Sequence, residues 1–160
     1  MPAPIEFYFD FSSPYGYLAA TRIDALAAKH GRSVNWHPIL LGAVFKVTGG
    51  APLPSFPLKG TYSERDMARS ARLLSIPFRL PSKFPIPTQA AARTMLWVQG
   101  ADAQGAKALA AALYRAYFAE DRDISDPAIC ADVAAQCGYE RVQALAGMND
   151  AGVKDKLRAE

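Results

Sequence analysis

The stretch from Ile5 to Leu18 constrains the fold more than any other part of the chain. It begins as an apolar, aromatic run with strand-like alternation, and it breaks at Ser12-Ser13-Pro14. Ser13 is well placed as the N-cap of a helix and Pro14 as its first residue, where a missing amide hydrogen costs nothing. Free amides and the positive end of the helix dipole would then surround the Ser13 hydroxyl. The corner could therefore hold an anion; the alternative is that Ser13 only caps a helix.

The remaining sequence predicts a β-α-β start followed by a helical region. We expect strands over 4–11 and 33–39, with a helix over 14–30 between them, which favours a parallel strand pair with a right-handed crossover. Two irregular segments rich in proline follow, at 49–57 and 76–87, and we expect the first to be functional. The other predicted helices are a short stretch ending at Val47 and the ranges 62–74, 88–99, 103–119, 127–137, 139–147 and 149–159.

The composition is that of a globular protein. With 160 residues and 51% hydrophobic content, the chain can bury a substantial core. The apolar runs are too short to cross a bilayer and the first residues lack the features of a secretory signal, so we expect a cytoplasmic protein with no membrane partner. The net charge of +3 is scattered, which argues against a nucleic-acid partner but suits an acidic small substrate.

The cysteines and histidines do not have the spacing of a metal site. Cys130 and Cys137 are seven residues apart in a helical pattern, and we expect them to pack in the helical region. The two histidines, His30 and His37, fall at a predicted helix end and on a predicted strand, where packing or capping is the favoured interpretation. We therefore predict no metal.

The run from Phe9 to Ala19, FDFSSPYGYLA, resembles the start of the 2-hydroxychromene-2-carboxylate isomerases and kappa-class glutathione transferases, relatives of DsbA with a thioredoxin-like core. The resemblance implies an α/β, thioredoxin-like fold: residues 1–48 would form its N-terminal part, and residues 49–160 the proline-rich active-site loops and an inserted α-helical lobe. The wider family has Cys-x-x-Cys at this corner. Here the corner reads Ser13-Pro14-Tyr15-Gly16, which excludes dithiol exchange there. Similarity continues in Lys59-Gly60-x-Tyr62, Ser75-Ile76-Pro77-Phe78 and Asp123-Ile124-Ser125-Asp126-Pro127.

The same resemblance implies a glutathione-dependent isomerase in which the Ser13 hydroxyl stabilises the glutathione thiolate. The thiolate would add reversibly to a small aromatic or chromene-type carboxylate, the partner that we expect. Relatives imply a homodimer. The implied site residues are Ser13, Pro14, Tyr15 and Lys59 for glutathione, and Ser55, Phe56 and Phe84 for the substrate.

Two other functions stay open, a kappa-like glutathione transferase and a non-catalytic thioredoxin-like binding module. Departures from the family pattern leave the natural substrate undetermined. Phe45 and Phe84 replace a lysine and a tyrosine that face the substrate in the better-known isomerases, and Gly49-Gly50 replaces the family Gly-Asn. Family members also continue into a closing β-β-α unit that this chain, which ends at Glu160, does not contain. We expect either a truncated sequence or a partner chain that completes the sheet.

Overall fold

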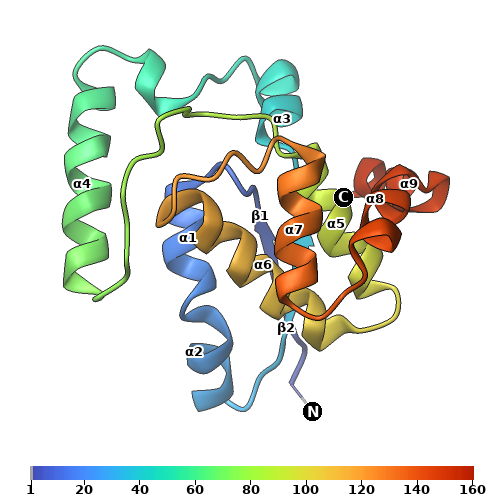
Figure 1. Ribbon diagram of the computed structural model, residues 1–160. Coiled ribbons are helices and arrows are strands. Elements are labelled where there is room, and N and C mark those ends of the chain that lie inside the picture. Colours follow the sequence, from blue (N-terminus) through green and yellow to red (C-terminus); the bar gives the residue numbers. More distant parts are fainter. Residues whose placement is uncertain (1) are drawn as a thin grey trace.

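The computed structural model describes residues 2–160 and contains a small parallel sheet with a helical region packed around it (Figure 1). The strands are β1 (Ile5–Phe9) and β2 (Val34–Pro38). The helices are α1 (Pro14–Ala20), α2 (Ile23–Lys29), α3 (Leu41–Thr48), α4 (Lys59–Leu73), α5 (Gln89–Gln99), α6 (Ala103–Phe118), α7 (Pro127–Gln136), α8 (Arg141–Asn149) and α9 (Ala151–Ala159), with a short 3-10 helix, η1, at Leu53–Ser55.

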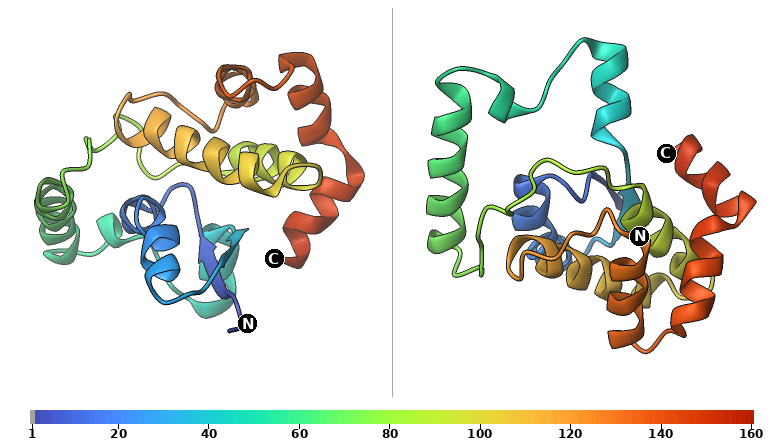
Figure 2. Two further views of the ribbon diagram at one scale, coloured as in Figure 1. Left: turned by 90° about the horizontal axis from the view of Figure 1, so that it is seen from below. Right: turned by 45° about the horizontal axis from the view of Figure 1, so that its top comes forward.

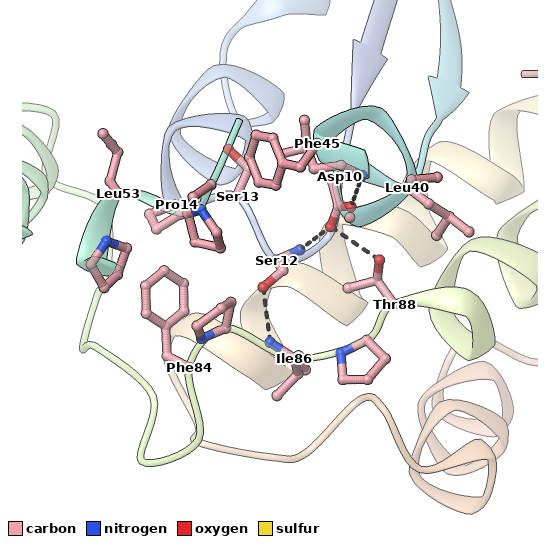
Figure 3. A pocket seen from close by; sticks show the side chains of 18 of the residues that line it. Asp10, Ser12, Ser13, Pro14, Leu40, Phe45, Leu53, Phe84, Ile86 and Thr88 are labelled. Carbon is pink, nitrogen blue, oxygen red and sulfur yellow. Dashed lines mark hydrogen bonds between the residues drawn. The ribbon is translucent and has the colours of Figure 1, made fainter. Parts of the chain in front are cut away.

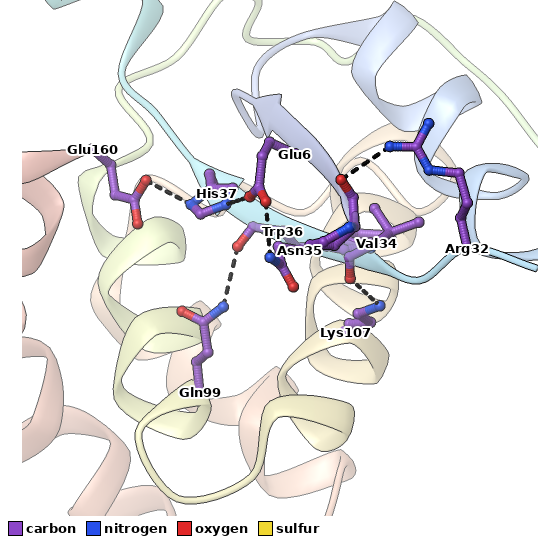
Figure 4. Close-up of polar contacts among 10 residues, drawn as sticks. Glu6, Arg32, Val34, Asn35, Trp36, His37, Gln99, Lys107 and Glu160 are labelled. Carbon is purple, nitrogen blue, oxygen red and sulfur yellow. Dashed lines mark hydrogen bonds and ion pairs between the residues drawn. The ribbon is translucent and has the colours of Figure 1, made fainter. Parts of the chain in front are cut away.

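The predicted β-α-β start is confirmed. β1 pairs with β2 in parallel, with Ile5 opposite Val34 and Phe9 opposite Pro38. β2 is protected on the side away from β1, because Lys107 of α6 donates to the Val34 carbonyl oxygen at 2.8 Å and Gln99 of α5 to that of Trp36 at 3.1 Å (Figure 4). On the sheet surface the His37 ring stacks on Tyr8 with centroids 4.7 Å apart, which confirms the expected packing. The imidazole also contacts Glu6 at 2.6 Å and Glu160 at 2.8 Å, which the sequence did not predict.

The predicted helix over 14–30 is wrong in one respect, because it breaks into α1 and α2. The Thr21 hydroxyl donates to the Leu18 carbonyl oxygen at 2.8 Å, a local bond that competes with regular helix. Arg22 then leaves the helical conformation, with φ −129°. As a result α1 has only seven residues, so fewer peptide dipoles add up at the Ser13 corner than the sequence predicted.

The core is aromatic where α6 meets the start of the chain. Phe9 and Phe11 pack against Tyr114, and Tyr17 stacks on Phe118 with ring centroids 5.5 Å apart. α5, α6, α7 and α8 pack on one another, and α4 and the α8–α9 pair lie at opposite ends of the molecule (Figures 1 and 2). Cys130 is buried in this core and Cys137 is partly buried, which confirms that both pack in the helical region.

Candidate functional site

The corner between β1 and α1 forms part of the wall of a cavity of about 650 Å³. That volume lies within the range of small-molecule sites. The opposite walls come from α3, from the segment around η1 and from the second proline-rich segment, and the lining is mostly apolar (Figure 3). Residues far apart in the sequence thus line one cavity.

Ser13 caps α1 and also lines the cavity. Its Oγ accepts a hydrogen bond from the amide of Gly16 at 3.0 Å, which confirms the predicted N-cap. Among the residues that the structure describes, no acceptor takes the Ser13 hydroxyl proton. Because a hydroxyl donates one proton and accepts at two lone pairs, Ser13 can cap the helix and still donate to a ligand.

Tyr15 lines the same cavity, but its hydroxyl is already engaged. It donates to Asp66 of α4 at 2.8 Å. Partial burial, and secondly this hydrogen bond to a carboxylate, raise the pKa of Tyr15 to about 12. Tyr15 therefore joins α1 to α4, and its hydroxyl proton is already donated to Asp66.

Phe84 and Phe45 both line the cavity, as does Lys46, which follows Phe45 on α3. Over residues 2–160, Lys46 is the one lysine or arginine in that lining. Lys83 lies outside it and pairs with Asp123 at 2.9 Å. The positive charge near the cavity therefore comes from α3 and not from the proline-rich segment.

The structure does not bring every predicted site residue to the cavity. Pro14 lines it, whereas Ser55, Phe56 and Lys59 are exposed and lie outside its lining, to which Leu53 and Pro54 contribute. The Lys59 ammonium instead lies 5.8 Å from the centre of the Phe56 ring. The roles assigned to these three residues stay predictions.

Sequence reasoning missed a buried carboxylate in the cavity wall, that of Asp10, which is only 4% exposed. Burial raises its pKa above the ordinary value. The motif that contains Asp10 gave the signal, since an acidic residue at the end of an apolar strand needs hydrogen-bond donors when it is buried. Thr88 supplies one of these donors, a hydroxyl 3.0 Å from the carboxylate.

Residues 2–160 contain neither a metal-binding cluster nor a membrane-spanning helix. No group of three or more His, Cys, Asp or Glu side chains within residues 2–160 is arranged to hold a metal ion. In that same range, no helix has both the length and the apolar character needed to cross a membrane.

Comparison with known proteins reveals a family and several relatives. The 2-hydroxychromene-2-carboxylate isomerase of Pseudomonas sp. (strain C18) is 36% identical over 103 residues, which are 62% of this chain and 47% of that protein. The glutathione S-transferase kappa 1 of Caenorhabditis elegans is 35% identical over 81 residues, 50% of this chain and 36% of the relative. The matched segments thus span less than half the length of either relative.

A solved structure of a 2-hydroxychromene-2-carboxylate isomerase superposes with a TM-score of 0.82 at 26% identity, covering 96% of this chain and 75% of that one. The fold is therefore the α/β, thioredoxin-like fold with a helical insertion that the corner motif implied. The family model described as the DSBA-like thioredoxin domain matches residues 4–160, so the chain belongs to the DsbA-like thioredoxin family.

Proposed function

We propose that the protein is a glutathione-dependent isomerase of the 2-hydroxychromene-2-carboxylate type. The observation that carries the proposal is the Ser13 hydroxyl, which lines a cavity of about 650 Å³ and has a proton to donate. A thiol needs such a donor, because a hydrogen bond to the charged form lowers its pKa and only the thiolate is an effective nucleophile. The isomerases and kappa-class transferase among the relatives also support it.

The residues around the cavity fit a thiol cofactor and an aromatic acid. The chemistry that bound glutathione supplies is reversible addition of its sulfur to a conjugated carbon: one C–S bond forms and later breaks, with no net oxidation. Ser13 holds the sulfur in its charged form by donating a hydrogen bond. Phe45 and Phe84 offer apolar surface to an aromatic ring, and Lys46 offers a positive charge to a carboxylate.

Glutathione titration into the 160-residue protein tests the role of Ser13, with Ser13→Ala as the variant. A matched control is Asp102→Ala, because Asp102 caps α6 through the amide of Gly105 at 2.8 Å and does not line the cavity. Both variants should lose about 1 kcal/mol of stability, the usual contribution of an N-cap. Only Ser13→Ala should raise the thiol pKa of bound glutathione, by about one to two units, since a charge-assisted hydrogen bond contributes about 1.5 to 3 kcal/mol.

Equal pKa values of the glutathione thiol in the parent protein and in Ser13→Ala would contradict the proposed role of Ser13 in stabilising the thiolate. A folded parent protein that binds no glutathione would leave a non-catalytic binding module as the function to pursue.

A second candidate is a kappa-like glutathione transferase, favoured by the relative of that name. The same cavity and the same Ser13 hydroxyl would serve conjugation, in which the C–S bond is kept and the product is released with glutathione attached. Turnover of 1-chloro-2,4-dinitrobenzene, compared with isomerisation of a chromene carboxylate, separates the two reactions. An isomerase should return glutathione unchanged, whereas a transferase should consume one glutathione for each product.

A further inference from the structure

The carboxylate of Asp10 is the point at which three walls of the cavity meet. Its Oδ1 accepts from the amide of Ser12 at 2.7 Å and from the hydroxyl of Thr88 at 3.0 Å. Its Oδ2 accepts from the amide of Leu41 at 2.7 Å (Figure 3). The donors belong to the corner before α1, to the start of α3 and to the end of the second proline-rich segment. One buried side chain therefore connects elements that no sheet or helix joins.

The wall formed by α3 depends on this contact. None of the residues of α3 is buried, and its N-cap residue, Leu40, has no side chain that can satisfy the first amides. Asp10 supplies that cap from another element through the amide of Leu41. A carboxylate at a helix N-terminus is favoured both by the hydrogen bond and by the dipole. The start of α3 is thus fixed by Asp10 and not by its own sequence.

The second proline-rich segment depends on the same corner. Residues 84–88 contain Pro85 and Pro87, which have no amide hydrogen, and form no helix or strand. Thr88 bonds to Asp10, and the amide of Ile86 donates to the hydroxyl of Ser12 at 3.2 Å. The corner thus fixes the middle and the end of this segment. Its start, at Phe84, is also held by α6, where the Tyr117 hydroxyl donates to the Lys83 carbonyl oxygen at 2.8 Å and Phe118 packs on the Phe84 ring.

We propose that Asp10 is a positioning residue that sets the separation between α3 and residues 84–88, and so the shape of the cavity between Phe45 and Phe84. The expected effect on catalysis rests on the proposed function, whereas the expected effect on the positions of α3 and residues 84–88 does not. An ionised carboxylate suits the role because it only accepts hydrogen bonds, and all three partners only need an acceptor. In Asp10→Asn the side-chain NH2 group would face one of these three hydrogen-bond donors, and that hydrogen bond would be lost.

Hydrogen exchange in the protein without ligand tests the structural part directly. Asp10→Asn should speed exchange of the amides in Leu41–Thr48 and of the Ile86 amide by about tenfold, while α6 and α7 keep their rates. Thr88→Val, which fills the same space without the hydroxyl, should speed exchange of the Ile86 amide only, and Thr88→Ser should keep the parent rate. The control is Ser63→Ala, since the buried Ser63 hydroxyl donates to the Gly60 carbonyl oxygen at 2.7 Å within α4.

Unchanged exchange in both walls, or acceleration spread evenly over the molecule, would overturn the positioning role. If Asp10→Asn does not fold, the Thr88→Val and Thr88→Ser variants still test whether the Asp10 carboxylate holds residues 84–88. With active enzyme, Thr88→Val should raise the KM for the aromatic substrate about fivefold or more and leave the glutathione thiol pKa unchanged. If the parent protein binds no glutathione, the proposed function is wrong. The hydrogen-exchange result still tests whether Asp10 positions the two walls.

Discussion

The hydroxyl of Tyr114 donates to the backbone carbonyl oxygen of Asp10 at 2.9 Å, across 104 positions of sequence. Tyr114 is completely buried in α6, and its ring packs on Phe9, Phe11 and Tyr17. The same carbonyl oxygen accepts the amide of Ser13 at 2.9 Å. The helical region therefore holds the backbone of the corner whose side chains line the cavity.

Gly16 makes this arrangement possible and can be used to test it. A Cβ at position 16 would lie 2.7 Å from the Tyr114 hydroxyl oxygen and 3.2 Å from the Ser13 Cβ. Gly16→Ala should therefore destabilise the protein by about 1 to 3 kcal/mol, despite the helix propensity of alanine. In Tyr114→Phe the clashing oxygen is absent, so the alanine should cost less in the double variant. Urea unfolding of the four proteins measures this coupling, and strictly additive losses would contradict it.

A second packing prediction concerns α8. A methyl group at Gly147 would overlap the indole ring of Trp97 on α5. Gly147→Ala should destabilise the protein by about 1 to 3 kcal/mol, because the α5–α8 contact must open to accept it. Gly42→Ala in α3 is the control, since nothing lies within 4 Å of a Cβ there. That substitution should be neutral or stabilising by up to about 1 kcal/mol in thermal unfolding; a similar loss at both positions would refute the packing argument.

Stability at alkaline pH should depend on Tyr15. Its pKa is raised from 10.0 to about 12 in the folded protein, so the folded state holds this proton more tightly than the unfolded state. The resulting stabilisation is fully present below pH 10 and is lost as the pH rises through about 12. Tyr15→Phe should therefore make the fall in unfolding free energy over this range shallower.

The control for Tyr15 is Tyr8→Phe, at an exposed tyrosine of β1. Urea unfolding as a function of pH, together with tyrosinate absorbance, measures both effects. An unchanged slope in Tyr15→Phe would show that the Tyr15 phenol does not cause the fall. Tyr17, Tyr114 and Tyr117, whose pKa values burial also raises, would then be the groups to test.

The charge of Lys46 should favour acidic aromatic ligands. We expect Lys46→Gln to weaken binding of 2-naphthoate by up to about fivefold, because an exposed ion pair contributes at most about 1 kcal/mol. Binding of neutral 2-naphthalenemethanol should not change. Lys83→Gln is the matched control, since that lysine pairs with Asp123 outside the cavity. Fluorescence titration without glutathione measures the affinities. Equal effects of the two substitutions on 2-naphthoate binding would show that the net charge of the protein, and not the position of Lys46, causes the preference.

Much of the local structure could be predicted from residue patterns. The alternation at the start of the chain identified β1, and Ser13-Pro14 identified the first helical turn. Asp102 and Asp126 also cap the helices that follow them, and both are residue types that favour this position. These features depend on residues within about four positions of one another, and such neighbours can be identified in the sequence without knowing the fold.

Features set by distant contacts could not be predicted in this way. The expected strand ends early, at Phe9, because the Asp10 carboxylate turns to meet Leu41 and Thr88, 31 and 78 positions away. Lys59 matches a motif of the family and Ser55 was an implied substrate contact, yet both lie outside the cavity lining, to which η1 contributes Leu53 and Pro54.

The sequence by itself determined the corner and its chemistry: an N-capping serine, no Cys-x-x-Cys pair and a proline at the first helical position. Only the tertiary structure decided which side chains surround that serine and where Asp10 points. The physical reason is burial. A carboxylate removed from water must find donors wherever the folded chain provides them, and those donors come from segments whose separation along the sequence gives no sign of their contact.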